Sequence, residues 1–149
     1  MRGKLYLIPS TIGAESTSSV IPSGIIDIIR TIKYIIVEKP RTARRFLIQL
    51  GIKPPFDDLT FFTLDKHTRQ DEISGFLEPV SGENIGLLSE AGVPCVADPG
   101  AEIVRLAHLK NIDVIPLVGP SSILLALMAS GLNGQNFTFN GYLPIQRNQ

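Results

Sequence analysis

The chain of 149 residues contains a single cysteine, Cys95, and two histidines that lie far apart, His67 and His108. One cysteine excludes an internal disulfide, and the scattered histidines offer no cluster that could bind a metal. We therefore expect a cytoplasmic protein without a metal cofactor, because a chain that lacks disulfides suits a reducing compartment.

The chain also lacks net charge and long apolar runs. Fourteen basic residues balance fourteen acidic ones, so a contact with nucleic acid would depend on a local basic cluster. The apolar run at residues 5–8 is too short for a signal peptide or a membrane span, and we expect no membrane contact. Hydrophobic residues make up 44% of the chain, which is enough for one folded domain.

Two nucleotide-binding fingerprints are absent as well. The chain has neither the G-x-G-x-x-G pattern of dinucleotide-binding proteins nor a P-loop. The turn at residues 9–13 (PSTIG) holds too few glycines for a close approach to a pyrophosphate. These absences argue against a nucleotide-dependent oxidoreductase.

What the sequence does contain is a regular alternation of strand and helix patterns. Compact apolar or β-rich runs predict strands, and segments with an apolar face, bounded by capping residues, predict helices. The predicted strands are residues 5–8, 34–37, 59–64, 84–89 and 112–118. The predicted helices are residues 24–32 with Ser23 as N-cap, 42–50 ended by Gly51, 72–77, 101–110 and 122–130.

This alternation predicts an α/β, Rossmann-like domain over residues 1–131, with a parallel five-stranded sheet and helices on both faces. Residues 132–149 differ in character and are predicted to begin a second α/β domain that the chain does not complete. Ligands bind beyond the carboxyl ends of the strands in such sheets. Residues 9–13, 38–41, 90–98 and 119–122 should therefore line one edge.

Two of these loops have the composition of a binding site. Residues 89–100 (SEAGVPCVADPG) form a stiff loop whose backbone can approach a ligand without obstruction from side chains. An ordinary turn explains them equally well, with Asp98 capping the next helix and Pro99 in its first position. Residues 119–122 (GPSS) could hold a polar ligand group at a helix N-terminus or could be simple caps.

Four segments in order carry a resemblance to a known family: residues 5–13 (LYLIPSTIG), 89–100, 115–122 (IPLVGPSS) and 137–144 (FTFNGYLP). Together they resemble the small-subunit ribosomal RNA ribose 2′-O-methyltransferases of the tetrapyrrole (uroporphyrin/corrin) methylase superfamily. The resemblance implies an S-adenosylmethionine-dependent methyltransferase that modifies a cytidine of ribosomal RNA. It also implies a donor cleft between two domains and a homodimer.

The resemblance further implies which residues contact the donor. Matched by position, these are Pro9, Ile12, Glu90, Val93, Ser121 and Ser122. Glu90 stands where the family usually has aspartate, which shifts the charge by one methylene. Because most of the second domain is missing, we expect a fragment that binds the donor weakly or not at all by itself.

Residues 38–45 (EKPRTARR) occupy the place of an E-D-T-R motif in the RNA-modifying relatives. Glu38, Arg41 and Arg44 match that motif, whereas two intervening residues depart from it. Arg41 and Arg44 are the predicted substrate contacts. With Arg45 they share one side of a helix, where they could neutralise phosphates or form a solvated face with surface ion pairs.

Transfer of an activated methyl group requires alignment and exclusion of water rather than a catalytic triad. A ribose hydroxyl must still lose its proton, and the candidate acceptors are Glu38, Asp65 and His67. The departures from the family motifs leave two alternatives open. One is a methyltransferase of the same superfamily that acts on a small molecule or a protein side chain; the other is a non-catalytic module that binds RNA or S-adenosylmethionine.

Overall fold

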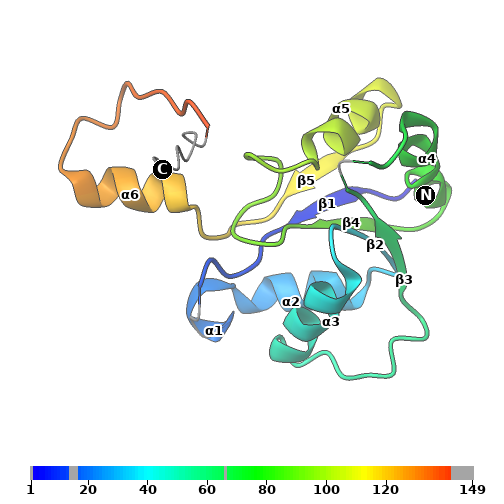
Figure 1. The fold of residues 1–149 in the computed structure, drawn as a ribbon. Coiled ribbons are helices and arrows are strands. Elements are labelled where there is room, and N and C mark those ends of the chain that lie inside the picture. The colour runs from blue at the N-terminus through cyan, green and yellow to red at the C-terminus, as the bar shows by residue number, and fades with distance from the viewer. Residues whose placement is uncertain (1, 14–16, 66, 142–149) are drawn as a thin grey trace, which may run out of the picture.

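A computed structural model of the chain describes residues 2–13, 17–65 and 67–141. Neighbouring strands in its five-stranded sheet run parallel, in the order β3-β2-β4-β1-β5 (Figure 1). The strands are β1 (Leu5–Ile8), β2 (Tyr34–Val37), β3 (Thr60–Thr63), β4 (Ile85–Leu88) and β5 (Val114–Pro116). The predicted parallel sheet is therefore confirmed.

The three central strands end at the same level of the sheet. Leu88, the last residue of β4, pairs with Ile8 of β1 on one side and with Val37 of β2 on the other. All three side chains are buried. The residues that follow these strands consequently emerge side by side at one edge, where a parallel sheet binds its ligands.

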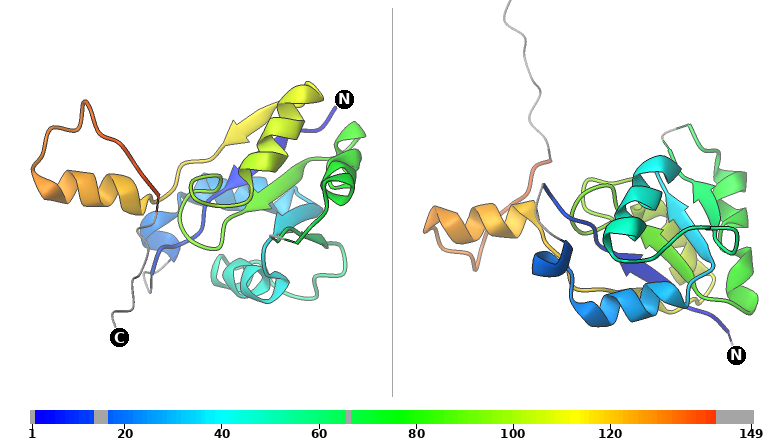
Figure 2. Two further views of the ribbon diagram at one scale, coloured as in Figure 1. Left: turned by 45° about the horizontal axis from the view of Figure 1, so that its top comes forward. Right: turned by 90° about the horizontal axis from the view of Figure 1, so that it is seen from below.

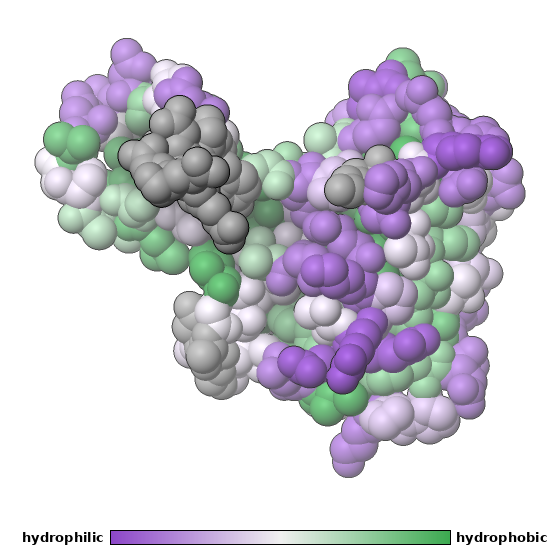
Figure 3. All heavy atoms as spheres, viewed as in Figure 1, coloured by the Kyte–Doolittle hydropathy of each residue, from purple (hydrophilic) through white to green (hydrophobic). Residues whose placement is uncertain are grey.

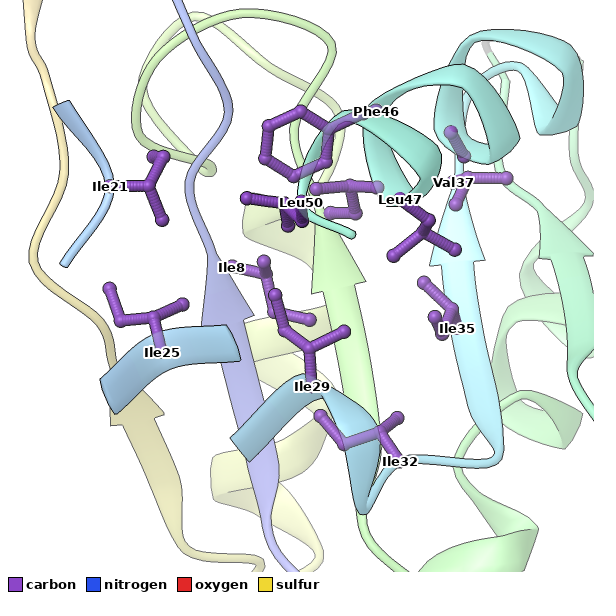
Figure 4. Close-up of a cluster of buried hydrophobic side chains, with 12 residues drawn as sticks. Ile8, Ile21, Ile25, Ile29, Ile32, Ile35, Val37, Phe46, Leu47 and Leu50 are labelled. Carbon is purple, nitrogen blue, oxygen red and sulfur yellow. The ribbon is translucent and has the colours of Figure 1, made fainter. Parts of the chain in front are cut away.

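One face of the sheet is covered by α1 (Thr17–Val20), α2 (Ser23–Arg30) and α3 (Pro40–Gln49). α2 directs Ile25 and Ile29, which are one helical turn apart, into a cluster of buried aliphatic residues. Figure 4 shows Ile29 next to Ile8 of β1, with Ile25 on one side of this pair and Ile35 of β2 on the other. The helices on this face are held by close packing of apolar side chains.

The opposite face is covered by α4 (Gln70–Gly75), a short 3₁₀ helix (Glu78–Ser81) and α5 (Ala101–Leu109) (Figure 1). Ile103 and Ala107 of α5 are fully buried and pack in a cluster with Leu5 and Ile85 of the sheet. The prediction of helices on both faces is thus confirmed.

The last helix, α6 (Ser122–Ser130), projects away from the sheet (Figures 1 and 2). None of its residues is buried, although its sequence, SILLALMAS, is apolar on all sides. Met128 is 78% exposed and Leu124 is 52% exposed. The space-filling view shows apolar residues at the surface of this part of the molecule (Figure 3). A helix that is apolar all round is normally buried, so α6 is an unusual surface element.

Several predicted boundaries need correction. α2 begins at Ser23 itself and has Pro22 as its N-cap, so Ser23 is not the predicted cap. α3 begins at Pro40, two residues earlier than predicted, because proline is well suited to the first turn of a helix. The helix predicted at residues 72–77 is α4 (Gln70–Gly75), which begins and ends two residues earlier. The four-residue helix α1 was not predicted.

Residues 132–141 contain neither helix nor strand, and the rest of the predicted second domain, residues 142–149, lies outside the described residues. That domain stays a prediction. No helix among the residues described is long and apolar enough to cross a membrane. In the same part of the chain, no group of histidine, cysteine, aspartate or glutamate residues could hold a metal ion.

Candidate functional site

The loops that follow β1 and β4 are joined by their backbones. The N–H group of Ser10 donates a hydrogen bond of 2.9 Å to the carbonyl oxygen of Gly92. The N–H group of Gly92 donates one of 3.4 Å to the carbonyl oxygen of Thr11. The expectation that these two loops lie together at one edge is therefore confirmed.

The loop after β5 closes on the same place. A Cβ atom on Gly92 would lie 2.9 Å from the carbonyl oxygen of Pro120, so only glycine allows this approach. Gly92 also has a φ of +67°, which glycine adopts without strain. Three loops from different strands thus converge at one point.

Between these loops lies a first cavity of about 230 Å³. It brings together four of the six predicted donor contacts, namely Ile12, Val93, Ser121 and Ser122. Phe139, which sequence reasoning did not select, also lines it. Only its place in the fourth resembling segment distinguishes Phe139 in the sequence.

The other two predicted donor contacts lie elsewhere. Pro9 is fully buried and packs against Gly119, and it does not line the first cavity. Glu90 lines a second, smaller cavity of about 80 Å³ beside α3. Arg45 and Gln49 of α3 line this second cavity too, and sequence reasoning did not single out Gln49.

Both binding loops contain features of ordinary turns. The Ser121 hydroxyl accepts a hydrogen bond of 3.4 Å from the N–H group of Leu124 and so caps α6, as the simpler interpretation expects. Asp98 does not cap α5, because that helix begins at Ala101 with Gly100 as its N-cap. The Asp98 carboxylate accepts a bond of 2.6 Å from the N–H group of Gly100 instead. The predicted capping by Asp98, with Pro99 in the first turn, is wrong.

The loop after β4 holds two residues other than glycine in the left-handed region, Cys95 with a φ of +69° and Ala97 with a φ of +57°. Such backbone conformations are uncommon for these residues and often occur at functional sites. Burial, together with the nearby charge of Asp98, raises the pKa of the Cys95 thiol to about 11. This thiol is therefore protonated at neutral pH and is no nucleophile.

Glu38 follows β2, directly beside the loop after β4. Its carboxyl is partly buried, and desolvation raises its pKa above the ordinary value. The negative charges of Asp98 and Glu90 raise the pKa further. The structure therefore brings Glu38 into the electrostatic field of the converging loops.

Asp65 and His67, the other candidate proton acceptors, follow the edge strand β3 and line neither cavity. The Asp65 carboxylate accepts a hydrogen bond of 2.7 Å from the backbone N–H of His67 and another from the Thr68 hydroxyl. The bond from His67 is the main cause of a lowered pKa of Asp65. Both residues thus belong to a separate exposed turn.

Three arginines project from α3, and their side chains are exposed. The guanidinium of Arg44 lies 5.0 Å from the centre of the Phe61 ring, within the range of a cation–π interaction. Arg45 lines the second cavity. Arg41 is exposed near the start of α3, on the same stretch of surface.

The chain is similar to several proteins named ribosomal RNA small subunit methyltransferase I. The protein from Xylella fastidiosa is 39% identical over 117 residues, which cover 78% of this chain and 41% of the relative. The protein from Escherichia coli O157:H7 is 32% identical over 144 residues, or 96% of this chain and 48% of the relative. The protein from Bacillus subtilis is 33% identical over 147 residues, or 99% of this chain and 48% of the relative.

No protein-family model matches the chain. The chain spans about half the length, 41% to 48%, of these three curated relatives. The similarity nevertheless extends over all three converging loops, since two of the alignments cover nearly the whole chain. Over the part it shares with these relatives, the chain is a homologue of the proteins named ribosomal RNA small subunit methyltransferase I.

Proposed function

We propose that the chain supplies the donor-binding part of an S-adenosylmethionine-dependent methyltransferase that acts on ribosomal RNA, at the ribose 2′-oxygen of a cytidine. The convergence of the loops after β1, β4 and β5 on one cavity carries this proposal. The names of the homologous proteins support the choice of ribosomal RNA. In this proposal residues 1–131 form the first domain, residues 132–149 begin a second one, and the protein works in the cytoplasm.

The first cavity suits part of a donor molecule. Ile12 and Val93 give it apolar walls, and Ser121 and Ser122 contribute polar ones. Its volume of about 230 Å³ lies below the roughly 300–1,000 Å³ of complete small-molecule sites, so a second body of protein would complete it. Pro9 and Glu90 contribute through the loops that they build rather than by lining this cavity. When bound, the donor supplies a methyl group already activated on a sulfonium.

Glu38 is the proposed acceptor of the ribose proton. A carboxylate with a raised pKa binds a proton more readily, and Glu38 is the candidate that shares the field of the converging loops. Asp65 and His67 are less suited, because they form an exposed turn after the edge strand. Arg41 and Arg44 are proposed to contact backbone phosphates from the exposed side of α3.

A homodimer is proposed as the working state, and α6 supports it. An exposed helix that is apolar all round would be covered in an assembly of two copies. Leu124, Phe137 and Phe139 also line a shallow apolar groove of about 380 Å³ beside the first cavity. A symmetric contact through this surface would lie close to the proposed donor site.

The test is a titration of the ¹⁵N-labelled chain with S-adenosylhomocysteine, followed by nuclear magnetic resonance so that weak binding is detected. We expect shifts of the backbone signals of Ile12, Val93 and Ser122. Replacement Val93→Asp should abolish them, because it places a charge in an apolar wall. The control Leu109→Asp alters an exposed residue of α5 and should change nothing.

Failure of S-adenosylhomocysteine to bind at millimolar concentration both to the chain and to a fusion of the chain with the second half of the Bacillus subtilis relative would contradict the proposed donor site. Binding by that fusion without transfer of labelled methyl groups to ribosomal RNA would instead favour a non-catalytic module. Transfer to a small molecule or a protein, and not to RNA, would favour another methyltransferase of the same superfamily.

A further inference from the structure

The second cavity lies back to back with the first. Thr11 lines the second cavity and the next residue, Ile12, lines the first; Glu90 and Ala91 divide in the same way. Neighbouring residues of the same two loops thus line the two cavities, and backbone hydrogen bonds hold these loops together. A group in the second cavity would therefore lie near a donor held in the first.

The second cavity has an apolar floor. Val37, Ala43, Phe46 and Leu88 form it, and none of these side chains is more than 6% exposed. They come from β2, α3 and β4, whose packing in the core fixes the floor rigidly. Such a surface suits the flat, apolar face of a ring.

The rim of the same cavity is polar. Arg45 and Gln49 of α3 stand on one side and Glu90 stands on the other. Among the residues that the structure describes, none makes a side-chain hydrogen bond or ion pair with these three side chains. Donors on one side and an acceptor on the other are therefore available to a ligand.

Carboxylates outnumber the one arginine that lines this cavity, Arg45, and so disfavour a phosphate inside it. Glu90 lines the cavity, and Glu38 lies near enough to both Glu90 and Asp98 to interact with them electrostatically. A neutral ring with hydrogen-bonding edges avoids this repulsion. Nucleobases have this combination of an apolar face with donors and acceptors along the edge.

We propose that the second cavity, which at about 80 Å³ encloses only part of a pyrimidine, receives one side of the base of the acceptor nucleotide, with Glu90 accepting a hydrogen bond from an exocyclic amine of that base. Arg45 and Gln49 donate hydrogen bonds to its ring nitrogen or carbonyl oxygen. A base with a carbonyl group facing Glu90 is disfavoured, because two acceptors would then oppose each other. This assignment rests on the proposed methyl transfer to RNA and makes Glu90 a specificity residue for that reaction.

The experiment follows backbone signals of the ¹⁵N-labelled chain during titration with cytidine monophosphate and with uridine monophosphate. We expect shifts of Thr42, Arg45 and Glu90, and tighter binding of the cytidine nucleotide, because only its base carries an exocyclic amine. Replacement Glu90→Gln should reduce the preference for cytidine about tenfold, since an amide both donates and accepts. The exposed Glu78→Gln is the matched control and should preserve the preference.

A second variant, Arg45→Gln, tests the site independently in case Glu90→Gln does not fold. Arg45→Gln should weaken the binding of both nucleotides, while the signals of Val93 and Ser122 should still shift with S-adenosylhomocysteine. A short single-stranded RNA with one cytosine distinguishes an RNA site from a site for free nucleotides. It should bind more tightly than the mononucleotide and shift Arg41 as well; equal affinity of the two ligands would overturn the assignment to RNA.

The outcomes separate this inference from the proposed function. If S-adenosylhomocysteine shifts the first cavity but neither nucleotide shifts the second, the base site is wrong and the donor site stands. If the nucleotides bind in the second cavity without preference, and Glu90→Gln changes nothing, the role of Glu90 is wrong. If S-adenosylhomocysteine binds neither the chain nor its fusion with the second half of the relative, the proposed function itself fails.

Discussion

A Cβ atom on Gly119 would lie 2.1 Å from the Cβ atom of Pro9 and 2.5 Å from its Cγ atom. Pro9 follows β1 and Gly119 follows β5, and these two strands pair with Leu7 opposite Pro116. The pyrrolidine ring of Pro9 is rigid and fully buried, so it cannot move aside. The absence of a side chain at Gly119 is therefore what lets the loop after β5 pass over the loop after β1.

The first prediction follows from this contact. Replacement Gly119→Ala should lower the free energy of unfolding by about 1–3 kcal/mol, because the added methyl group overlaps a rigid ring. It should also weaken binding of S-adenosylhomocysteine, since the displaced loop carries Ser121 and Ser122. Urea denaturation and the titration described above measure the two effects.

The matched control is Gly24→Ala in α2, where an added Cβ atom meets no atom within 4 Å. This change should raise stability by up to about 1 kcal/mol, because alanine favours helix over glycine. If Gly119→Ala proved as stable as the natural chain, the close packing of these two loops would be refuted.

The second prediction concerns Gly92, where the first cavity depends on the absence of a side chain. Replacement Gly92→Ala forces a left-handed φ on alanine and puts a methyl group 2.9 Å from the carbonyl oxygen of Pro120. We expect affinity for S-adenosylhomocysteine to fall at least about tenfold, a change that costs roughly 1.4 kcal/mol of binding free energy.

Gly82→Ala provides the comparison for this variant. Gly82 has a φ of −146°, outside the left-handed region, and no atom lies within 4 Å of an added Cβ. Affinity should be unchanged there. Equal affinities of the Gly92→Ala and Gly82→Ala variants would exclude the first cavity as the donor site.

The sequence was sufficient to predict the fold because each strand is a short apolar run closed by turn residues. β1 and β2 have the predicted bounds, since polar residues, proline or glycine flank them closely. β5 is shorter than predicted, at three residues, and pairs with β1 from Val114 to Pro116. α1 was missed, since a helix of four residues has no measurable periodicity.

The site was only partly predictable from sequence, for a physical reason. Position in the chain identified the loops, and Ile12, Val93, Ser121 and Ser122 indeed share one cavity. Which way a loop side chain points depends on φ and ψ, and the left-handed residues of the loop after β4 redirect its chain. Sequence therefore did not reveal that Glu90 and Ala91 line different cavities.

The third prediction concerns the exposed apolar helix α6. Replacement of Leu124 and Met128 by glutamate should abolish concentration-dependent self-association, because it introduces charges into the proposed contact. Sedimentation velocity over a range of concentrations measures this. Leu109→Glu changes another exposed leucine, on α5, and self-association should persist in that variant. If the double variant associated as strongly as the control, α6 would not be the dimer contact.

The fourth prediction concerns Glu38 and separates stability from activity. Its folded-state pKa is raised above the ordinary value of 4.5, so the native state holds this proton more tightly than the unfolded state does. As pH rises through the raised pKa, the native state must carry a partly desolvated charge, and stability is lost. Below pH 4.5 both states are protonated, and no such loss occurs.

Replacement Glu38→Gln removes this charge. The variant should be more stable than the natural chain at pH 7, by about 0.5 kcal/mol or less because solvent screens a partly exposed group, and the difference should shrink at pH 4. If Glu38 accepts the ribose proton, the same substitution in the fusion with the second half of the relative should slow methyl transfer to RNA about a hundredfold, in the range of general-base effects. Glu78→Gln should alter neither property. Urea denaturation at both pH values and the transfer assay together test whether Glu38 is the proton acceptor. Replacing a side chain with a purely structural role would lower stability and activity together.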